Sequence, residues 1–324
     1  MQLPAELRAA TAQALEGVSR TELARRAERM SELYRGGGMS AAAVRDETDA
    51  LAYAVSRMPA TFAAVRNVFA RLQERCPEFD PRSMLDLGAG PGTASWAASE
   101  AWPAIETVTQ VDSNPGLTTL GAKLAEASLS RALRTARRES ADLAKQDFPG
   151  LGADLVILAY TVGEIAPHAS IGALGAAWSA CSEALVIVEP GTPKGFEGIL
   201  RARDLLLGEG ARIVAPCPHE RACPLAAPDW CHFAQRVART RDHMLLKSAE
   251  LPWEDEKFSY IIAVREDVFT APEKGRILAQ PEAGKAAVQV KLCKRDGTAA
   301  LVQIARRDAH AFKQARKKNW GDEF

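Results

Sequence analysis

The chain has 324 residues, of which 47% are hydrophobic, and this is enough apolar material for one large core or two modest ones. The 41 Lys and Arg residues balance the 41 Asp and Glu residues, so net charge points to neither a nucleic-acid nor a membrane partner. No apolar run approaches the roughly 18 residues of a membrane span, and the N-terminal segment lacks a signal-peptide pattern, so we expect a cytoplasmic protein.

Residues 1–80 predict an N-terminal helical region. Residues 4–34 show the periodicity of one or two amphipathic helices, with Ser19 and Glu22 in capping-box spacing. Helical spacing resumes near Ser40 and continues to Pro77. The frequent arginines of the first segment favour a solvated helix face, with a nucleic-acid surface as the alternative.

Residues 81–265 predict an α/β domain with a doubly wound, mostly parallel sheet. Short apolar runs alternate with helical segments, which is the pattern of such a sheet. We expect strands at 84–87, 107–111, 133–137, 155–158, 185–188, 211–215 and 258–264, and helices at 93–101, 117–128, 171–179 and 195–207. Residues 216–255 interrupt this alternation as a Cys-rich, metal-binding insertion in which prolines break regular structure.

Residues 266–324 predict a small C-terminal β unit with a basic tail. Residues 288–292 and 300–304 alternate around a Gly-containing turn, which predicts a hairpin. The run from Arg306 to Lys318, followed by Trp320, suits contacts with RNA phosphates and a stacked base. A solvated helix end is the alternative for this run.

The stretch from Met84 to Thr93 predicts a nucleotide site, because a buried strand leads through glycines into a helix. Gly88, Gly90 and Gly92 permit a tight turn and the close approach of a ligand to the backbone. The helix that follows directs free amide groups toward the loop. The alternative is that the glycines only form a tight turn.

Three acids distinguish the ligand of this site. Asp86 would repel the pyrophosphate of a dinucleotide but can bind the ammonium group of S-adenosylmethionine. Asp112 follows the second strand, where a carboxylate can accept both ribose hydroxyls, and Asp142 is expected near the adenine. This pattern resembles the class I S-adenosylmethionine-dependent methyltransferases, which implies a Rossmann-like fold.

The residues after the fourth strand leave catalysis open. Many amino-methylating members of that superfamily carry an Asn/Asp-Pro-Pro-Tyr/Phe motif here, whereas this chain has Ala159 to Glu164. Tyr160 and Glu164 are candidate catalytic residues. In the alternative, Tyr160 packs on the cofactor and Glu164 caps a helix.

Four cysteines predict a metal site. Cys217, Cys223 and Cys231 lie in one Pro-rich loop, and Cys293 ends the first strand of the C-terminal hairpin. Four thiolates can bind zinc or an iron–sulfur cluster. The gaps in the loop are wider than those of zinc knuckles and favour the cluster, while simple burial of the cysteines is the alternative.

Several stretches together resemble a methyltransferase-like family associated with the mitochondrial small ribosomal subunit, which also has bacterial members. The resemblance extends over roughly residues 40–324 and rests on residues 51–61, 84–93, 188–195, 217–233 and 315–322. It implies a four-iron (4Fe-4S) cluster on Cys217, Cys223, Cys231 and Cys293, a role in small-subunit assembly and contact with ribosomal RNA.

We therefore expect an S-adenosylmethionine-binding, iron–sulfur protein that acts on or with the small ribosomal subunit or its RNA. One alternative is a methyltransferase of a small molecule or protein with a structural zinc site. Another is a non-enzymatic ribosome assembly factor in which the cofactor only stabilises the fold.

Overall fold

The centre of the structure is a sheet with the strand order β3-β2-β1-β4-β5-β8-β6, in which β7 also pairs with β8. The structure is a computed structural model that describes residues 1–35, 40–145, 150–265 and 274–324. The strands are β1 (Ser83–Leu87), β2 (Thr107–Val111), β3 (Arg137–Glu139), β4 (Ala153–Ala159), β5 (Cys181–Pro190), β6 (Arg212–Ala215), β7 (Phe233–Ala238) and β8 (Trp253–Val264). β1 to β5 are parallel, whereas β8 is antiparallel to β5, β6 and β7. The predicted doubly wound, mostly parallel sheet is confirmed.

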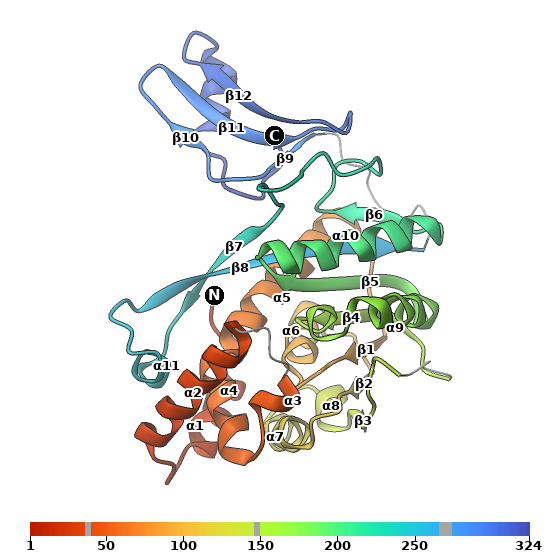
Figure 1. The fold of residues 1–324 in the computed structure, drawn as a ribbon, viewed down its shortest axis with the longest axis vertical. Helices are drawn as coiled ribbons and strands as arrows, with labels where there is room; N and C mark the ends of the chain where they lie inside the picture. Colours follow the sequence, from red (N-terminus) through yellow and green to blue (C-terminus); the bar gives the residue numbers. More distant parts are fainter. Residues whose placement is uncertain (36–39, 146–149, 266–273) are drawn as a thin grey trace.

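Helices cover both faces of this sheet (Figure 1). They are α6 (Thr93–Ala101), α7 (Pro115–Ala125), α8 (Arg131–Arg134), η1 (Val162–Glu164), α9 (Pro167–Ala180) and α10 (Pro193–Gly208). Alternate residues of β5 show the two layers: Leu185 and Ile187 pack in the core with α9 and α10, whereas Val186 and Val188 face the opposite core. Burial on both faces explains the continuous apolar runs of the strands.

The N-terminal helices complete the second layer. They are α1 (Ala5–Ala14), α2 (Arg20–Arg35), α3 (Ser40–Ala43), α4 (Glu47–Ser56) and α5 (Met58–Arg75). The expected apolar stripe of α2 is buried at Leu23, Ala27 and Met30. Asp49 of α4 is buried and forms ion pairs of 2.9 Å and 2.6 Å with Arg26 and Arg29, which ties α2 to α4. Among the described residues, no helix combines the length and apolar content that crossing a membrane requires.

The prediction of a third strand at 133–137 was wrong in its position. The strand β3 begins at Arg137, and Leu133 lies in the short helix α8. Ser130 caps this helix, because its side chain accepts a hydrogen bond from the backbone of Leu133. A local capping interaction therefore outweighs the apolar run from which the strand was predicted.

The prediction that residues 216–255 lack regular structure was also wrong in part. β7 and the helix α11 (Arg241–Leu246) lie within this stretch, and β8 already starts at Trp253. Four of the five prolines precede Phe233, and Pro252 adjoins the start of β8, so the segment between them is free to pair and to form a helix. The stretch from Pro216 to His232 retains the irregular backbone that was expected.

The C-terminal residues form a second, four-stranded sheet, at the upper end of Figure 1. Its elements are β9 (Arg276–Ile277), β10 (Glu282–Ala283), β11 (Ala287–Cys293), β12 (Ala299–Ala305) and α12 (Ala309–Ala315). The predicted hairpin is confirmed as β11 and β12, with Val290 opposite Val302. This unit has a core of its own around Ile277, Val288 and Ile304.

Candidate functional site

The glycine loop lies at the carboxyl end of β1, where its backbone adopts conformations that favour glycine. Gly88, Gly90 and Gly92 all have positive φ angles, of 75°, 54° and 79°. A Cβ atom at Gly88 would lie 2.3 Å from Oγ1 of Thr161, and one at Gly92 would lie 2.4 Å from Nε2 of Gln110. All three positions therefore favour glycine because of their positive φ angles. Gly88 and Gly92 also need it because a Cβ atom would collide with Thr161 and Gln110, whether or not a ligand is bound.

Asp112 holds the loop from the end of β2. Its Oδ2 accepts a hydrogen bond of 2.7 Å from the Gly90 amide, and its Oδ1 accepts one of 2.7 Å from the Asn114 amide. Burial raises the pKa of this carboxyl group. The structure thus brings Asp112 and the glycine loop together at the carboxyl edge of the sheet, where open α/β sheets bind ligands.

Asp86 lies beneath the loop. Its side chain is 1% exposed, and its Oδ2 accepts hydrogen bonds from the amide of Ser95 at 3.1 Å and from its hydroxyl at 2.7 Å. Burial raises the pKa of Asp86 to about 7. Asp86 therefore anchors the first turn of α6 to the end of β1.

Asp142 lies on the segment after β3 and is partly exposed. Its carboxylate accepts a hydrogen bond from the amide of Ala144 and pairs with Lys145 at 3.0 Å. The hydrogen bond from Lys145 lowers the pKa of Asp142. Within the part of the chain that the structure describes, no hydrogen bond or ion pair joins Asp142 to the glycine loop.

Tyr160 follows β4 with a φ angle of 60°, which is uncommon for a residue other than glycine. Its hydroxyl donates a hydrogen bond of 2.7 Å to Oε1 of Glu256 on β8. Burial raises the pKa of both groups. Glu164 lies half-buried at the end of η1. The Tyr160 hydroxyl therefore has a partner within the chain.

Glu189 at the end of β5 is a site residue that the sequence prediction missed. It is 1% exposed, and its two carboxylate oxygens accept hydrogen bonds from the amides of Val162 and Gly163 at 2.8 Å and 3.0 Å. Burial raises its pKa to about 7. The available signal was an acid at the end of an apolar strand, which is the same signal that singled out Asp86.

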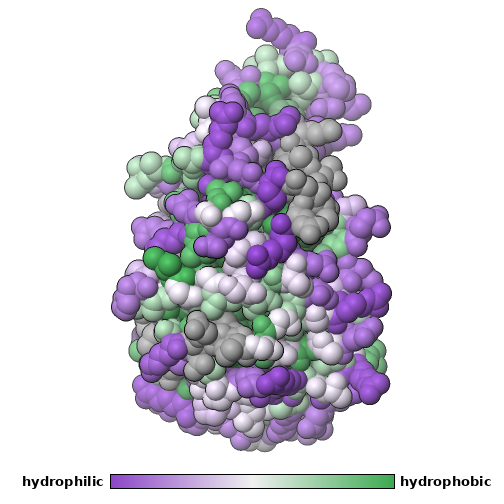
Figure 2. Space-filling view, turned by 90° about the vertical axis from the view of Figure 1, so that its right-hand side faces the viewer, coloured by the Kyte–Doolittle hydropathy of each residue, from purple (hydrophilic) through white to green (hydrophobic). Residues whose placement is uncertain are grey.

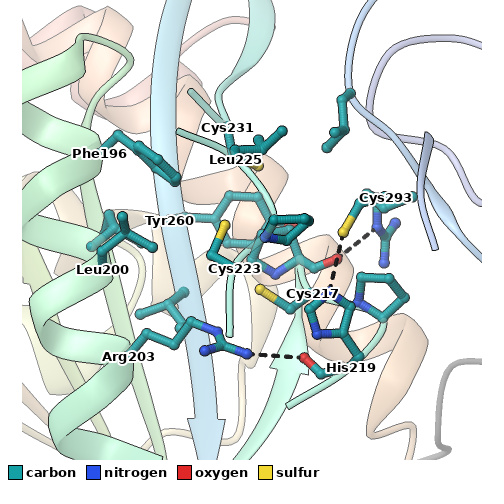
Figure 3. A pocket seen from close by; sticks show the side chains of 17 residues that line it. Phe196, Leu200, Arg203, Cys217, His219, Cys223, Leu225, Cys231, Tyr260 and Cys293 are labelled. Atoms are coloured by element: carbon teal, nitrogen blue, oxygen red, sulfur yellow. Dashed lines mark hydrogen bonds between the residues drawn. The ribbon is translucent and has the colours of Figure 1, made fainter. Parts of the chain in front are cut away.

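The four predicted metal-binding cysteines line one cavity of about 30 Å³ between the two sheets (Figure 3). Cys217, Cys223 and Cys231 come from the loop before β7, and Cys293 comes from the end of β11. His219 also lines the cavity, and its Nε2 lies 3.4 Å from Sγ of Cys293. None of the six cysteines, all of which are described, forms a disulfide.

The electrostatics of the cavity reflect its burial. Burial raises the pKa values of Cys217 and Cys231, and it raises that of Cys293 to about 12. Neighbouring thiols raise these values further, whereas Arg203 and Arg276 act in the opposite direction on Cys293. The thiols therefore lie close enough to repel one another as thiolates, and two cations, Arg203 from α10 and Arg276 from β9, line the same cavity.

The thiol and imidazole groups are ligand types that a thiophilic metal prefers, but their arrangement is not that of a preformed site for a single metal ion. Within the described ranges, no three His, Cys, Asp or Glu side chains are placed so as to hold a metal ion. What fits is the chemistry of the set, since four thiols and one imidazole line the same enclosed space.

An aromatic stack lies beside this cavity. His232 stacks on Trp230 with a centroid distance of 4.9 Å, and Trp320 of the C-terminal tail meets His232 edge-on at 4.7 Å. The basic residues of the tail are largely exposed: Arg306, Arg307, Lys313, Arg316 and Lys317. On the face that Figure 2 shows, many hydrophilic side chains lie at this upper end of the molecule.

Comparison with known proteins gives one family and three curated relatives. The family model described as "Mitochondrial small ribosomal subunit Rsm22" matches residues 47–324. The human "Ribosome assembly protein METTL17, mitochondrial" is 28% identical over 289 residues, which cover 84% of this chain and 61% of that protein. The "Rsm22-cox11 tandem protein 2, mitochondrial" of Schizosaccharomyces pombe is 29% identical over 194 residues, which cover 54% of this chain and 25% of that protein.

Among solved structures, similarity is found with methyltransferases. A magnesium protoporphyrin IX methyltransferase from Synechocystis, solved with bound S-adenosylmethionine, has a TM-score of 0.43 and 15% identity, and covers 69% of this chain and 85% of its own. An O-methyltransferase family protein from Burkholderia thailandensis has the same TM-score and identity, and covers 68% of this chain and 61% of its own.

Proposed function

The chain belongs to the Rsm22 family of the mitochondrial small ribosomal subunit, and from this premise we propose that it binds S-adenosylmethionine, carries an iron–sulfur cluster and acts with the small ribosomal subunit and its RNA. Since the chain spans 61% of the human relative and less of the yeast one, the ribosomal role of those proteins enters here as part of the proposal. The observation that carries it is the family match over residues 47–324, within which both the glycine loop and the cysteine cavity lie.

The glycine loop supports binding of S-adenosylmethionine. Each carboxylate oxygen of Asp112 has accepted one hydrogen bond, from Gly90 or Asn114, and keeps capacity for a ribose hydroxyl. Asp86 is assigned to the amino-acid end of the ligand, and Asp142 to its adenine. The cofactor supplies a methyl group on a positively charged sulfur, which suits a site that carries the carboxyl groups of Asp86 and Asp112.

The cysteine cavity supports the cluster. Cys217, Cys223, Cys231 and Cys293 would provide the four thiolates, and zinc is the alternative metal. The wide gaps between the three loop cysteines favour the cluster over a single zinc ion. A reducing cytoplasm, which is the proposed location, would keep these thiols available for a metal.

The C-terminal sheet supports contact with RNA. The exposed basic residues from Arg306 to Lys317 can bind phosphates, and the half-buried Trp320 lies beside them. This surface adjoins the cysteine cavity through the edge-on contact of Trp320 with His232. We therefore place the RNA on the side of the molecule that carries the cysteines.

A non-enzymatic assembly factor is the second candidate function. The specific observation in its favour is that the Tyr160 hydroxyl, a candidate for catalysis, is bound to Glu256 within the chain. In that case S-adenosylmethionine would act only by stabilising the folded state. The variant Asp112→Asn, expressed at a saturating level, tests this. If it no longer binds S-adenosylmethionine but still supports normal cell growth and subunit assembly, the assembly role does not need the cofactor.

Anaerobic purification with metal analysis and cofactor mass spectrometry, followed by RNA crosslinking in cells, tests the proposal. We expect iron and sulfide, bound S-adenosylmethionine and crosslinks to small-subunit ribosomal RNA. Cys293→Ser should release the metal, whereas Cys76→Ser should retain it, because Cys76 is buried but does not line the cavity. Stoichiometric zinc would refute the cluster, and the absence of ribosomal RNA among the crosslinks would refute the ribosomal role.

A further inference from the structure

Arg203 is a buried cation on the wall of the cysteine cavity. It lies on α10, is 2% exposed and faces the cavity that the four thiols line (Figure 3). Its Nη2 donates hydrogen bonds to the carbonyl oxygens of His219 at 3.2 Å and Arg221 at 2.6 Å. Its Nε has no hydrogen-bond partner among the described residues. The loop thus holds the guanidinium in place without using all of its five N–H donors.

This cation lacks a buried counter-charge. Within the described parts of the chain, the carboxylate that comes within ion-pair distance of Arg203 is that of Asp204, at 3.9 Å, and the Asp204 side chain is 78% exposed. Arg276, the other cation of the cavity wall, differs because it pairs with Glu323 at 3.0 Å. A buried charge without a partner costs several kcal/mol, so the position of Arg203 calls for an anion inside the cavity.

The four thiols can supply that anion when they bind a metal. Metal ligation requires thiolates, and four thiolates around one Zn²⁺ still leave two negative charges. Iron–sulfur centres on four thiolates are likewise anionic, and the charges and hydrogen bonds around the sulfurs set their reduction potentials. A cation in the same enclosed, low-dielectric space offsets part of this charge.

We propose that Arg203 is the counter-cation of the centre that the four cysteines hold, and that its charge sets how firmly the centre is retained. The inference rests on the proposed function, since it requires a metal centre on these thiols. It assigns Arg203 as a positioning residue whose charge matters beyond its bonds to the two loop carbonyls. Asp204, on the solvent side of the same helix, has no part in this role.

Three variants of the full chain separate charge from hydrogen bonding. Arg203→Lys keeps the charge but loses the forked donor, whereas Arg203→Gln keeps an N–H donor and loses the charge. Arg201→Gln on the same helix is the control, because Arg201 does not line the cavity. Each protein is purified anaerobically and reconstituted with iron and sulfide. Loss of iron to a chelator and the reduction potential of the centre are then measured.

We expect Arg203→Gln to lose iron about tenfold faster, because one nearby positive charge is removed from an anionic centre. Its potential should fall by an amount equivalent to a tenfold change in the oxidised-to-reduced ratio, which is about 59 mV for one electron. Arg203→Lys and Arg201→Gln should stay within about twofold of the unsubstituted protein.

Other outcomes overturn the inference in distinct ways. Equal losses in Arg203→Lys and Arg203→Gln would show that only the bonds to the loop matter. An Arg203→Gln protein that matches the unsubstituted chain would refute the inference while leaving the cluster intact. An unsubstituted protein that binds no metal would refute the proposed cluster and the inference together. If Arg203→Gln fails to fold, Arg203→Lys decides alone: retention within about twofold supports the role of charge, and a tenfold loss refutes it.

Discussion

Substitution of Glu189 by Gln should destabilise the protein by an amount that falls as the pH rises. Burial raises the pKa of this carboxyl group from 4.5 to about 7, so between these values the folded state binds the proton more tightly than the unfolded chain. The contribution of Glu189 to the free energy of unfolding is therefore complete below pH 4.5 and is lost as the pH rises through 7. The difference between the two pKa values corresponds to about 3 kcal/mol.

Glutamine removes the titration and one of the two acceptors. Its amide oxygen can accept the hydrogen bond from Val162 or from Gly163, and its amide NH2 then faces the other N–H. One buried donor without a partner costs about 1–3 kcal/mol at every pH. The cost of Glu189→Gln should therefore be largest near pH 4.5, at about 1–3 kcal/mol, and should decrease by about 3 kcal/mol on reaching about pH 8, where the variant equals or exceeds the unsubstituted protein in stability.

Urea unfolding followed by tryptophan fluorescence over this pH range measures the difference. Trp178, which is 3% exposed in the core beneath the same strand, reports on the unfolding of this part of the sheet. The exposed Glu209→Gln, at the end of α10, is the control and should show no such pH dependence. A cost of Glu189→Gln that stays constant or grows with pH would refute the assignment of a raised pKa to Glu189.

Three further predictions concern the helices, the loop and the tail. Asp49→Asn should lower the free energy of unfolding by about 2 kcal/mol. This is less than the loss expected for a fully buried ion pair, because the two arginine partners of Asp49 reach water. Unchanged urea unfolding of the variant would contradict this. Gly121→Ala should weaken S-adenosylmethionine binding about tenfold in calorimetry, because its Cβ would lie 2.9 Å from the Pro91 carbonyl group and would push α7 off the loop. Gly175→Ala, with nothing within 4 Å of its Cβ, should leave binding unchanged, and equal effects of the two would disprove the packing argument. Arg306→Gln should reduce the salt dependence of binding to a ribosomal RNA fragment by about one counterion, and an unaltered slope would remove this residue from the interface.

Elements that end at strong sequence signals could be predicted closely. The helix at 93–101 and the strand at 107–111 match α6 and β2 to the residue. The helix begins directly after Gly92 in its left-handed conformation, and the strand leads into the turn that Asp112 and Asn114 stabilise. Residues next to each boundary determine where the helix begins and where the strand ends, so both boundaries can be predicted from one sequence.

Elements that depend on distant partners could not be predicted in the same way. β7 is only partly buried, and it exists because β8 pairs with it across the turn that carries α11. The joining of Cys293 to the loop cysteines likewise depends on how the C-terminal sheet packs. Cys293 was expected there as the fourth thiol of a metal site, and the family resemblance implied the same four residues. Arg203 was missed because nothing local distinguishes a buried Arg on a helix from an exposed one, whereas Glu189 carried the same local signal as Asp86 and was overlooked.

The strand β8 contributes residues both to the surroundings of the glycine loop and to the cysteine cavity. Glu256 on this strand binds Tyr160 near the glycine loop, and Tyr260 four residues later lines the cysteine cavity. Successive residues of a strand face opposite sides, so inserting or deleting one residue between them would turn one side chain away from its site. Substitutions can therefore change the glycine-loop side or the cysteine cavity separately. An insertion or deletion in β8 between Glu256 and Tyr260, by contrast, would disrupt one of the two.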